Sequence, residues 1–143
     1  MARVTVDLPE HFPFETEIPK RIGDINYGGH LGNDTVLTLV HESRVRYLKS
    51  LGFTELNVGG CGITQADAAV VYRSEAFYGQ TVRIQVAARL EGRSSFDLYY
   101  RLTDISDGRE IAQVKTGIVC FDYTKRKVTR IPNVLRDAIT QDD

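Results

Sequence analysis

The chain has 143 residues, and its 18 basic and 19 acidic residues give a net charge of −1 at pH 7. This length suits one domain with a hydrophobic core, residues 1–143, and the balanced charge gives no reason to expect a nucleic acid or membrane partner. We expect a reduced, cytoplasmic protein, because no apolar run could span a bilayer, no leader follows Met1, and two cysteines build no disulfide framework.

The N-terminal part of the chain predicts one or two strands followed by a long helix. Apolar residues alternate in residues 4–8 and again from Phe14 to Ile18, which is typical of β-strands. From Asp34 to Leu51 the apolar period becomes that of an amphipathic helix of about five turns. Between the two lies the polar, glycine-rich stretch INYGGHLGND, residues 25–34.

Both ends of this helix carry the expected signals. Asn33 or Asp34 can cap the free N–H groups of the first turn, and Gly52 suits the left-handed conformation that follows a helix. Arg44 projects onto the apolar stripe, where an unpaired guanidinium would be destabilising. We expect it to reach water or to pair with a carboxylate such as Asp24, and a ligand contact is the less favoured alternative.

The rest of the chain predicts mainly strands. Alternating apolar residues indicate strands over 63–77, 81–91, 96–102 and 111–119, and the dipeptide Asp107-Gly108 is a hairpin signal. Residues 133–140 can form a last helical turn or two. Because one long helix is available to cover the apolar face of this sheet, we predict an α+β fold in which a curved antiparallel sheet wraps around that helix.

Residues 21–52, RIGDINYGGHLGNDTVLTLVHESRVRYLKSLG, resemble the loop and helix of hotdog-fold thioesterases of the 4-hydroxybenzoyl-CoA thioesterase type. Two further segments are similar to strands and turns of that family, YRSEAFYGQTV at 72–82 and LEGRSSFDLY at 90–99. The resemblance covers nearly the whole chain. It implies a hydrolase that cleaves acyl-CoA, without a cofactor, in clefts between the subunits of a homodimer or homotetramer.

The resemblance also implies roles for residues of the loop. A backbone N–H at the helix start, at about Asn33, would polarise the thioester carbonyl, and Gly28 and Gly29 would let the backbone approach the ligand closely. His30 matches a histidine found in many relatives. The position that usually holds an acidic residue is occupied by Asn26, and an amide is neither a base nor a carboxylate nucleophile.

Several groups therefore compete for the proton-transfer role. His30 has a suitable side chain for a base near neutral pH, although it could simply fix the turn. Asp34 is the carboxylate nearest to the helix start, but capping explains it adequately. Asp24 is better placed to support Asn26 than to act directly. His41 and Glu42 lie on the helix away from the centre of the apolar stripe, and a solvated or interface face is the favoured interpretation of both. Glu42 is a further candidate, because some hotdog enzymes use a helical glutamate.

Other sites are less well supported by the sequence. Arg93, Ser94 and Ser95 could touch the pantetheine or phosphates of CoA, as such segments do in this family, although a plain turn explains them too. The three histidines, at positions 11, 30 and 41, are too scattered to predict a metal site.

Three functions remain open at this stage. The first is acyl-CoA hydrolysis, with water activated by His30 or a nearby carboxylate and positioned by Asn26. The second is a binding module that holds an acyl-CoA or an acyl carrier without cleaving it, because the usual acid is absent. The third is a hydratase or dehydratase, for which His30 and Asp34 would be the acid–base pair.

Overall fold

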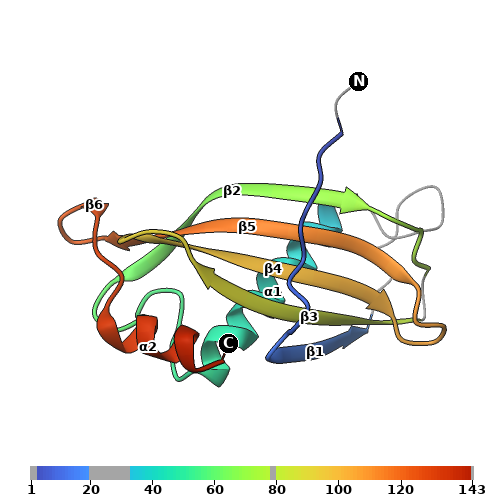
Figure 1. The fold of residues 1–143 in the computed structure, drawn as a ribbon, viewed down its shortest axis with the longest axis horizontal. Helices are drawn as coiled ribbons and strands as arrows, with labels where there is room; N and C mark the ends of the chain where they lie inside the picture. Colours follow the sequence, from blue (N-terminus) through green and yellow to red (C-terminus); the bar gives the residue numbers. More distant parts are fainter. Residues whose placement is uncertain (1–2, 20–32, 78–79, 143) are drawn as a thin grey trace.

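A computed structural model describes residues 3–19, 33–77 and 80–142 of the chain (Figure 1). Its helices and strands, in chain order, are β1 Phe14–Pro19, α1 Asn33–Ser50, β2 Gly62–Tyr72, β3 Thr81–Leu90, β4 Ser95–Asp104, β5 Glu110–Asp122, β6 Lys127–Val128 and α2 Asn133–Asp142.

The strands form one antiparallel sheet in the order β1-β3-β4-β5-β2, and the short β6 pairs with β5. β1 and β2 therefore lie at opposite edges of the sheet. β2 is an 11-residue edge strand whose central residues, 64–68, are exposed. A β-bulge between Gln65 and Asp67 interrupts its pairing with β5.

Helix α1 crosses one face of this sheet (Figure 1). The predicted alternation is confirmed in β4, where every second side chain is fully buried and the others are partly exposed. On the helix, Val36, Val40, Tyr47 and Leu48 are buried against this face, whereas Leu37 is 37% exposed. The predicted α+β arrangement, a curved sheet around one long helix, is thus confirmed, with α2 as a second, shorter helix.

The C-terminus of α1 ends as the sequence predicts. Gly52 has a φ of +89°, and its N–H donates to the carbonyl of Lys49 at 3.0 Å. The N–H of Phe53 donates to the carbonyl of Leu48 at 2.8 Å. These two bonds form a Schellman motif, which satisfies carbonyl groups that the helix end leaves free.

Of the one or two strands predicted near the N-terminus, one forms, which is β1. Residues 4–8 alternate in polarity but form no strand, and Val4 is 60% exposed. Figure 1 shows the reason, because this segment crosses over the strands and does not run alongside the edge of the sheet. The guanidinium of Arg101 lies 5.3 Å from the ring centre of Phe12, which places the chain after this segment against β4. No helix within the described ranges is long and apolar enough to cross a membrane.

Candidate active site

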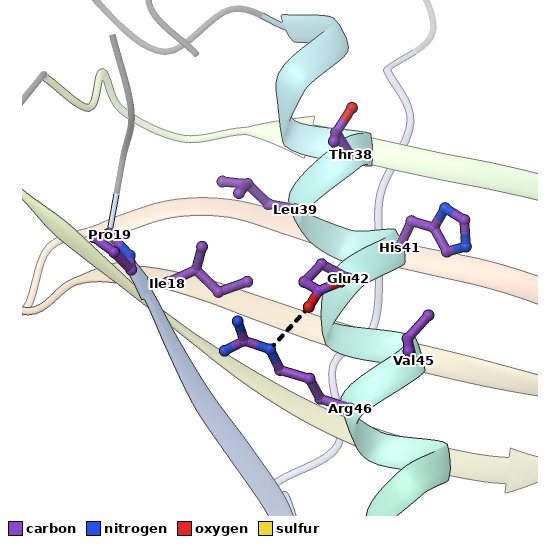
Figure 2. Close-up of a pocket in the computed structure, with 8 residues that line it drawn as sticks. All are labelled: Ile18, Pro19, Thr38, Leu39, His41, Glu42, Val45 and Arg46. Carbon is purple, nitrogen blue, oxygen red and sulfur yellow. Dashed lines mark hydrogen bonds and ion pairs between the residues drawn. The ribbon is translucent and has the colours of Figure 1, made fainter. Parts of the chain in front are cut away.

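A hollow of about 440 Å³ lies between the end of β1 and helix α1 (Figure 2). Ile18, Pro19, Leu39 and Val45 give it apolar walls, and its polar lining is Thr38, His41, Glu42 and Arg46. Its helical lining, from Thr38 to Arg46, spans the second to fourth turns of α1 and lies C-terminal to the helix start at which the sequence predicts the site.

Arg46 joins the helix to β1 on one side of the hollow. Its Nε donates to Glu42 at 3.1 Å, and its Nη1 donates to the Thr16 hydroxyl at 2.9 Å and to the Glu17 carbonyl at 3.1 Å. Figure 2 shows Glu42 and Arg46 facing the β1 side, with His41 on the other side of the helix. Glu42 therefore lines the hollow as a half-exposed carboxylate that is already bonded to a guanidinium.

Arg44 lies in the interior between α1 and β2, with a side chain that is 8% exposed. Its Nη1 donates to Gln65 Oε1 of β2 at 2.7 Å, and its Nη2 donates to Glu55 Oε2 at 3.1 Å. The prediction that Arg44 pairs with a carboxylate is therefore confirmed. Among the described residues, that carboxylate belongs to Glu55. Asp24, the carboxylate that the sequence suggested, lies outside the described residues.

Glu55 binds a second group with its other oxygen. His41 Nε2 lies 2.6 Å from Glu55 Oε1, so one carboxylate joins a buried guanidinium to an imidazole that is 58% exposed. We call these three residues, Arg44, Glu55 and His41, the relay. The sequence placed His41 on a solvated or interface face of the helix and did not single out Glu55. The signal that pointed to a carboxylate partner was the arginine on the apolar stripe of α1.

The relay adjoins a buried polar contact in the sheet. The Tyr100 hydroxyl lies 2.9 Å from Thr116 Oγ1, and both residues are fully buried. Burial raises the pKa of Tyr100 to about 12, although its contacts with Thr116 and Arg44 act in the opposite direction. Tyr100 is therefore a neutral hydroxyl at physiological pH and not a proton donor for chemistry.

The loop residues that the sequence singled out fall largely outside the described residues. This holds for Asp24, Asn26, Gly28, Gly29 and His30, and their proposed roles remain predictions. Asn33 is the first residue of α1 and Asp34 the second, which agrees with the predicted helix start.

Arg93, Ser94 and Ser95 lie in the hairpin between β3 and β4. The carbonyls of Arg93 and Ser94 accept backbone bonds from Ile131 and Cys120 at 2.7 and 2.9 Å. The hairpin is at the Leu90 end of β3, whereas the hollow is beside Pro19, which pairs with Thr81 at the other end. Within one subunit the structure therefore does not bring these residues to the hollow.

Within the part of the chain that the structure describes, we find neither a metal site nor a reactive cysteine. No cluster of three or more His, Cys, Asp or Glu side chains among these residues could hold a metal ion. Cys61 and Cys120 are free thiols, and burial raises the pKa of both, that of Cys120 to about 12. Neither is a thiolate suited to nucleophilic attack.

An antiparallel sheet wrapped around one long helix, with a hollow beside that helix, defines the hotdog class of proteins. The family model of the thioesterase-like superfamily matches residues 21–139, and the chain belongs to this family.

Individual relatives agree with this assignment. The chain is 26% identical over 127 residues to sll0410, a provisionally named esterase from Synechocystis, and the match covers 87% of this chain and 76% of the relative. The structure of Slr0204, a 1,4-dihydroxy-2-naphthoyl-CoA thioesterase from Synechocystis, matches with a TM-score of 0.81 at 20% identity, covering 89% of this chain and 95% of that one. A thioesterase from Thermus thermophilus, crystallised with coenzyme A and Zn, matches with a TM-score of 0.78 at 22% identity, covering 94% and 96%.

Proposed function

We propose that this protein hydrolyses an acyl-CoA thioester to a free acid and coenzyme A. Membership of the thioesterase-like superfamily over residues 21–139 is the observation that carries this proposal. The hollow beside α1 supports it, because it combines apolar walls, suited to an acyl group, with polar groups that can take part in proton transfer.

The start of α1 supplies the electrostatic part of the mechanism. The first turn of a helix has N–H groups without intrahelical partners and a partial positive charge. With the N–H of Asn33 directed at the thioester oxygen, this charge stabilises the oxyanion that forms when water attacks the carbonyl carbon. Asn26 positions the water or the thioester oxygen by hydrogen bonds, as the loop motif suggests.

A proton acceptor for the attacking water is also required. The loop offers His30 or a carboxylate near it, such as Asp34, and the described part of the hollow offers Glu42 and His41. Glu42 is the less suitable of these two, because one of its carboxylate oxygens is already bonded to Arg46.

We further propose that the active protein is a homo-oligomer, a dimer or a tetramer, with its sites at the subunit interface. The exposed edge of β2 supports this proposal, because a long edge strand is a template for pairing with another strand. Antiparallel pairing of two β2 strands would join the sheets edge to edge, as the family resemblance implies.

Thiol release from a panel of acyl-CoAs tests the hydrolysis. The panel should include short, medium and long saturated chains and aromatic acyl groups, each followed with a thiol reagent at neutral pH. We expect turnover of at least one member. The absence of turnover on every member would contradict the proposal, and calorimetric binding of the same compounds would then favour the binding module.

Replacement of Asn26 by Asp separates the enzyme from the binding module. In an enzyme adapted to asparagine, the substitution removes a hydrogen-bond donor and places a negative charge near the developing oxyanion. We expect kcat/KM to fall about 100-fold, by analogy with the loss of one oxyanion-hole donor. A gain of hydrolysis in Asn26→Asp over an inactive wild type would instead support the binding module.

A further inference from the structure

We propose that His41 is the proton-transfer residue of this enzyme and that Glu55 and Arg44 position it. This assignment rests on the hydrolysis proposed above and names its base among the described residues. It differs from the loop-based assignment to His30.

The contact with Glu55 fixes the tautomer of His41. An ionised carboxylate has no proton to donate, so the 2.6 Å contact requires His41 Nε2 to carry the hydrogen. The neutral imidazole then has its lone pair on Nδ1, the nitrogen that can accept a proton from water. The same logic, a carboxylate that selects the tautomer of a histidine base, operates in hydrolases with a Ser-His-Asp triad.

Glu55 is held in place independently of His41. Its second oxygen accepts from Arg44, and its backbone carbonyl accepts from the N–H of Ile63 at 2.9 Å. The loop that carries it is closed by two backbone bonds of 3.1 Å between Thr54 and Asn57. Because Arg44 binds the carboxylate and backbone bonds hold its loop, Glu55 is a preorganised acceptor for the imidazole.

Arg44 places a buried positive charge beside the carboxylate of Glu55. The guanidinium is almost fully buried, and Gln65 fixes its other terminal nitrogen. With one carboxylate oxygen bonded to Arg44 and the other to His41, Glu55 holds the imidazole in a fixed orientation.

Several charged groups surround His41. Glu55 faces it from the loop before β2, and Gln65 of β2, beyond Arg44, is neutral. On its own helix, Glu42 is bonded to Arg46, and Arg44 points to Glu55 and Gln65. Glu55 is therefore the carboxylate that contacts the imidazole directly.

His41 is also accessible to a substrate. Its side chain is 58% exposed, and it lines the hollow beside α1 together with Thr38 and Val45. Figure 2 shows its ring on the same side of the helix as Thr38 and Val45, away from Ile18 and Pro19.

The proposed step is balanced in protons and electrons. His41 Nδ1 takes a proton from water while the water oxygen forms a bond to the thioester carbon and the carbonyl becomes an oxyanion. Because His41 lies about 12 Å along α1 from Asn33, an Asn33 N–H that stabilises this oxyanion is not the one in the same chain. When the oxyanion collapses, the carbon–sulfur bond breaks, and the imidazolium returns the proton to the thiolate. The products are the free acid and a thiol.

The test compares pH profiles of kcat/KM for the wild type and for His41→Gln, His41→Ala and Glu55→Gln, with the acyl-CoA that the wild type hydrolyses fastest. We expect His41→Gln to lower kcat/KM about 100-fold or more and to remove the decline in rate at acidic pH. Glu55→Gln should leave a weaker enzyme, because a hydrogen bond to a neutral amide oxygen is weaker than one to a carboxylate and holds the imidazole less firmly. His11→Gln and Glu10→Gln are matched controls, because both side chains are exposed in the N-terminal segment.

Chemical rescue separates a proton-transfer role from a structural one. Added imidazole should restore part of the activity of His41→Ala in proportion to its concentration, and it should not accelerate His11→Ala. Thermal unfolding of each variant shows whether it is folded at the assay temperature, and alanine is well tolerated in a helix.

The results of these experiments test the role of His41 separately from the proposed hydrolysis of acyl-CoA. Wild-type turnover together with an unchanged rate and pH profile in both His41 variants would overturn the assignment and return the role to the loop. Absence of turnover by the wild type would overturn the proposed function as well. A rate loss in His41→Ala that imidazole does not restore would also count against proton transfer.

Discussion

Arg44 brings a full positive charge into the interior between α1 and β2, and the structure compensates it with Glu55 and Gln65. Removing one member of a buried ion pair is far more destabilising than replacing both members with apolar groups of similar volume, because it leaves the other charge uncompensated. The two members differ here, since Arg44 is 8% exposed whereas Glu55 is 26% exposed and can reach water.

This asymmetry predicts different stabilities for two single substitutions. Glu55→Ala should lower the free energy of unfolding by about 2–4 kcal/mol, slightly less than for a fully buried pair. Arg44→Met should lower it by less, because methionine fills an apolar site and the remaining carboxylate becomes hydrated. Urea unfolding measures both values.

The exposed pair Glu42 and Arg46 provides the control for this comparison. Glu42→Ala should change the free energy of unfolding by at most about 1 kcal/mol, because exposed ion pairs contribute little. Equal losses for Glu55→Ala and Arg44→Met would show that the burial of the guanidinium does not determine the stability of the relay.

At the scale of the elements, the end of α1 depends on the backbone of Gly52. A Cβ built on this residue meets no atom within 4 Å, so space is not the constraint. The constraint is the φ of +89°, which an L side chain rarely adopts. We expect Gly52→Ala to lower the free energy of unfolding by about 1–2 kcal/mol, measured by thermal or urea unfolding.

A second substitution at the same position tests the reason given. Asparagine tolerates the left-handed region better than alanine, so Gly52→Asn should recover a good part of the loss. If both variants were as stable as the wild type, the Schellman motif would not be contributing to the stability of the helix end.

The elements that the sequence predicts well are those with a clear period and a local end signal. β3 and β4 alternate because one face of the sheet is buried, and α1 ends before Gly52 because the backbone bonds there satisfy free carbonyl groups of the helix end. The helix begins at Asn33, as predicted. Residues 4–8 also alternate but form no strand, because pairing requires an available sheet edge and a local pattern does not show whether one exists.

The candidate site is less predictable for a similar reason. Arg44 on the apolar stripe of α1 shows that a partner exists, but its identity depends on where the loop before β2 folds. The contact between Arg44 and Glu55 joins residues 11 apart, and the contact with Gln65 joins residues 21 apart. Neither pair follows from a local pattern, so His41 could not be recognised as part of a relay before the structure was known.

At the scale of the whole molecule, the sheet has a long edge at β2 that is open in the described chain. Residues 64–68 are exposed, and Ala66 lies at the bulge where pairing with β5 is interrupted. An open edge of this length favours either pairing with a second copy or aggregation, and natural edge strands that stay unpaired usually carry lysine or proline. β2 carries neither in the stretch Gly62–Tyr72, which favours pairing.

We therefore expect lysines on this edge to dissociate the protein. The double variant Ala66→Lys, Ala68→Lys places like charges opposite each other across the proposed pairing of two β2 strands, which is destabilising. Sedimentation or light scattering should show a dimer or tetramer for the wild type and a smaller species for the variant. Thr124→Lys, in the exposed turn before β6, adds a charge elsewhere and should leave the oligomer unchanged.

The same variant connects assembly to chemistry. If each active site needs both subunits, the specific activity of the double variant should be low at nanomolar concentration and rise with protein concentration as the weakened dimer forms by mass action. Thr124→Lys should show constant specific activity over the same range. A monomeric variant with full activity at every concentration would mean that one chain, with its own α1 and its own His41, is a complete catalyst.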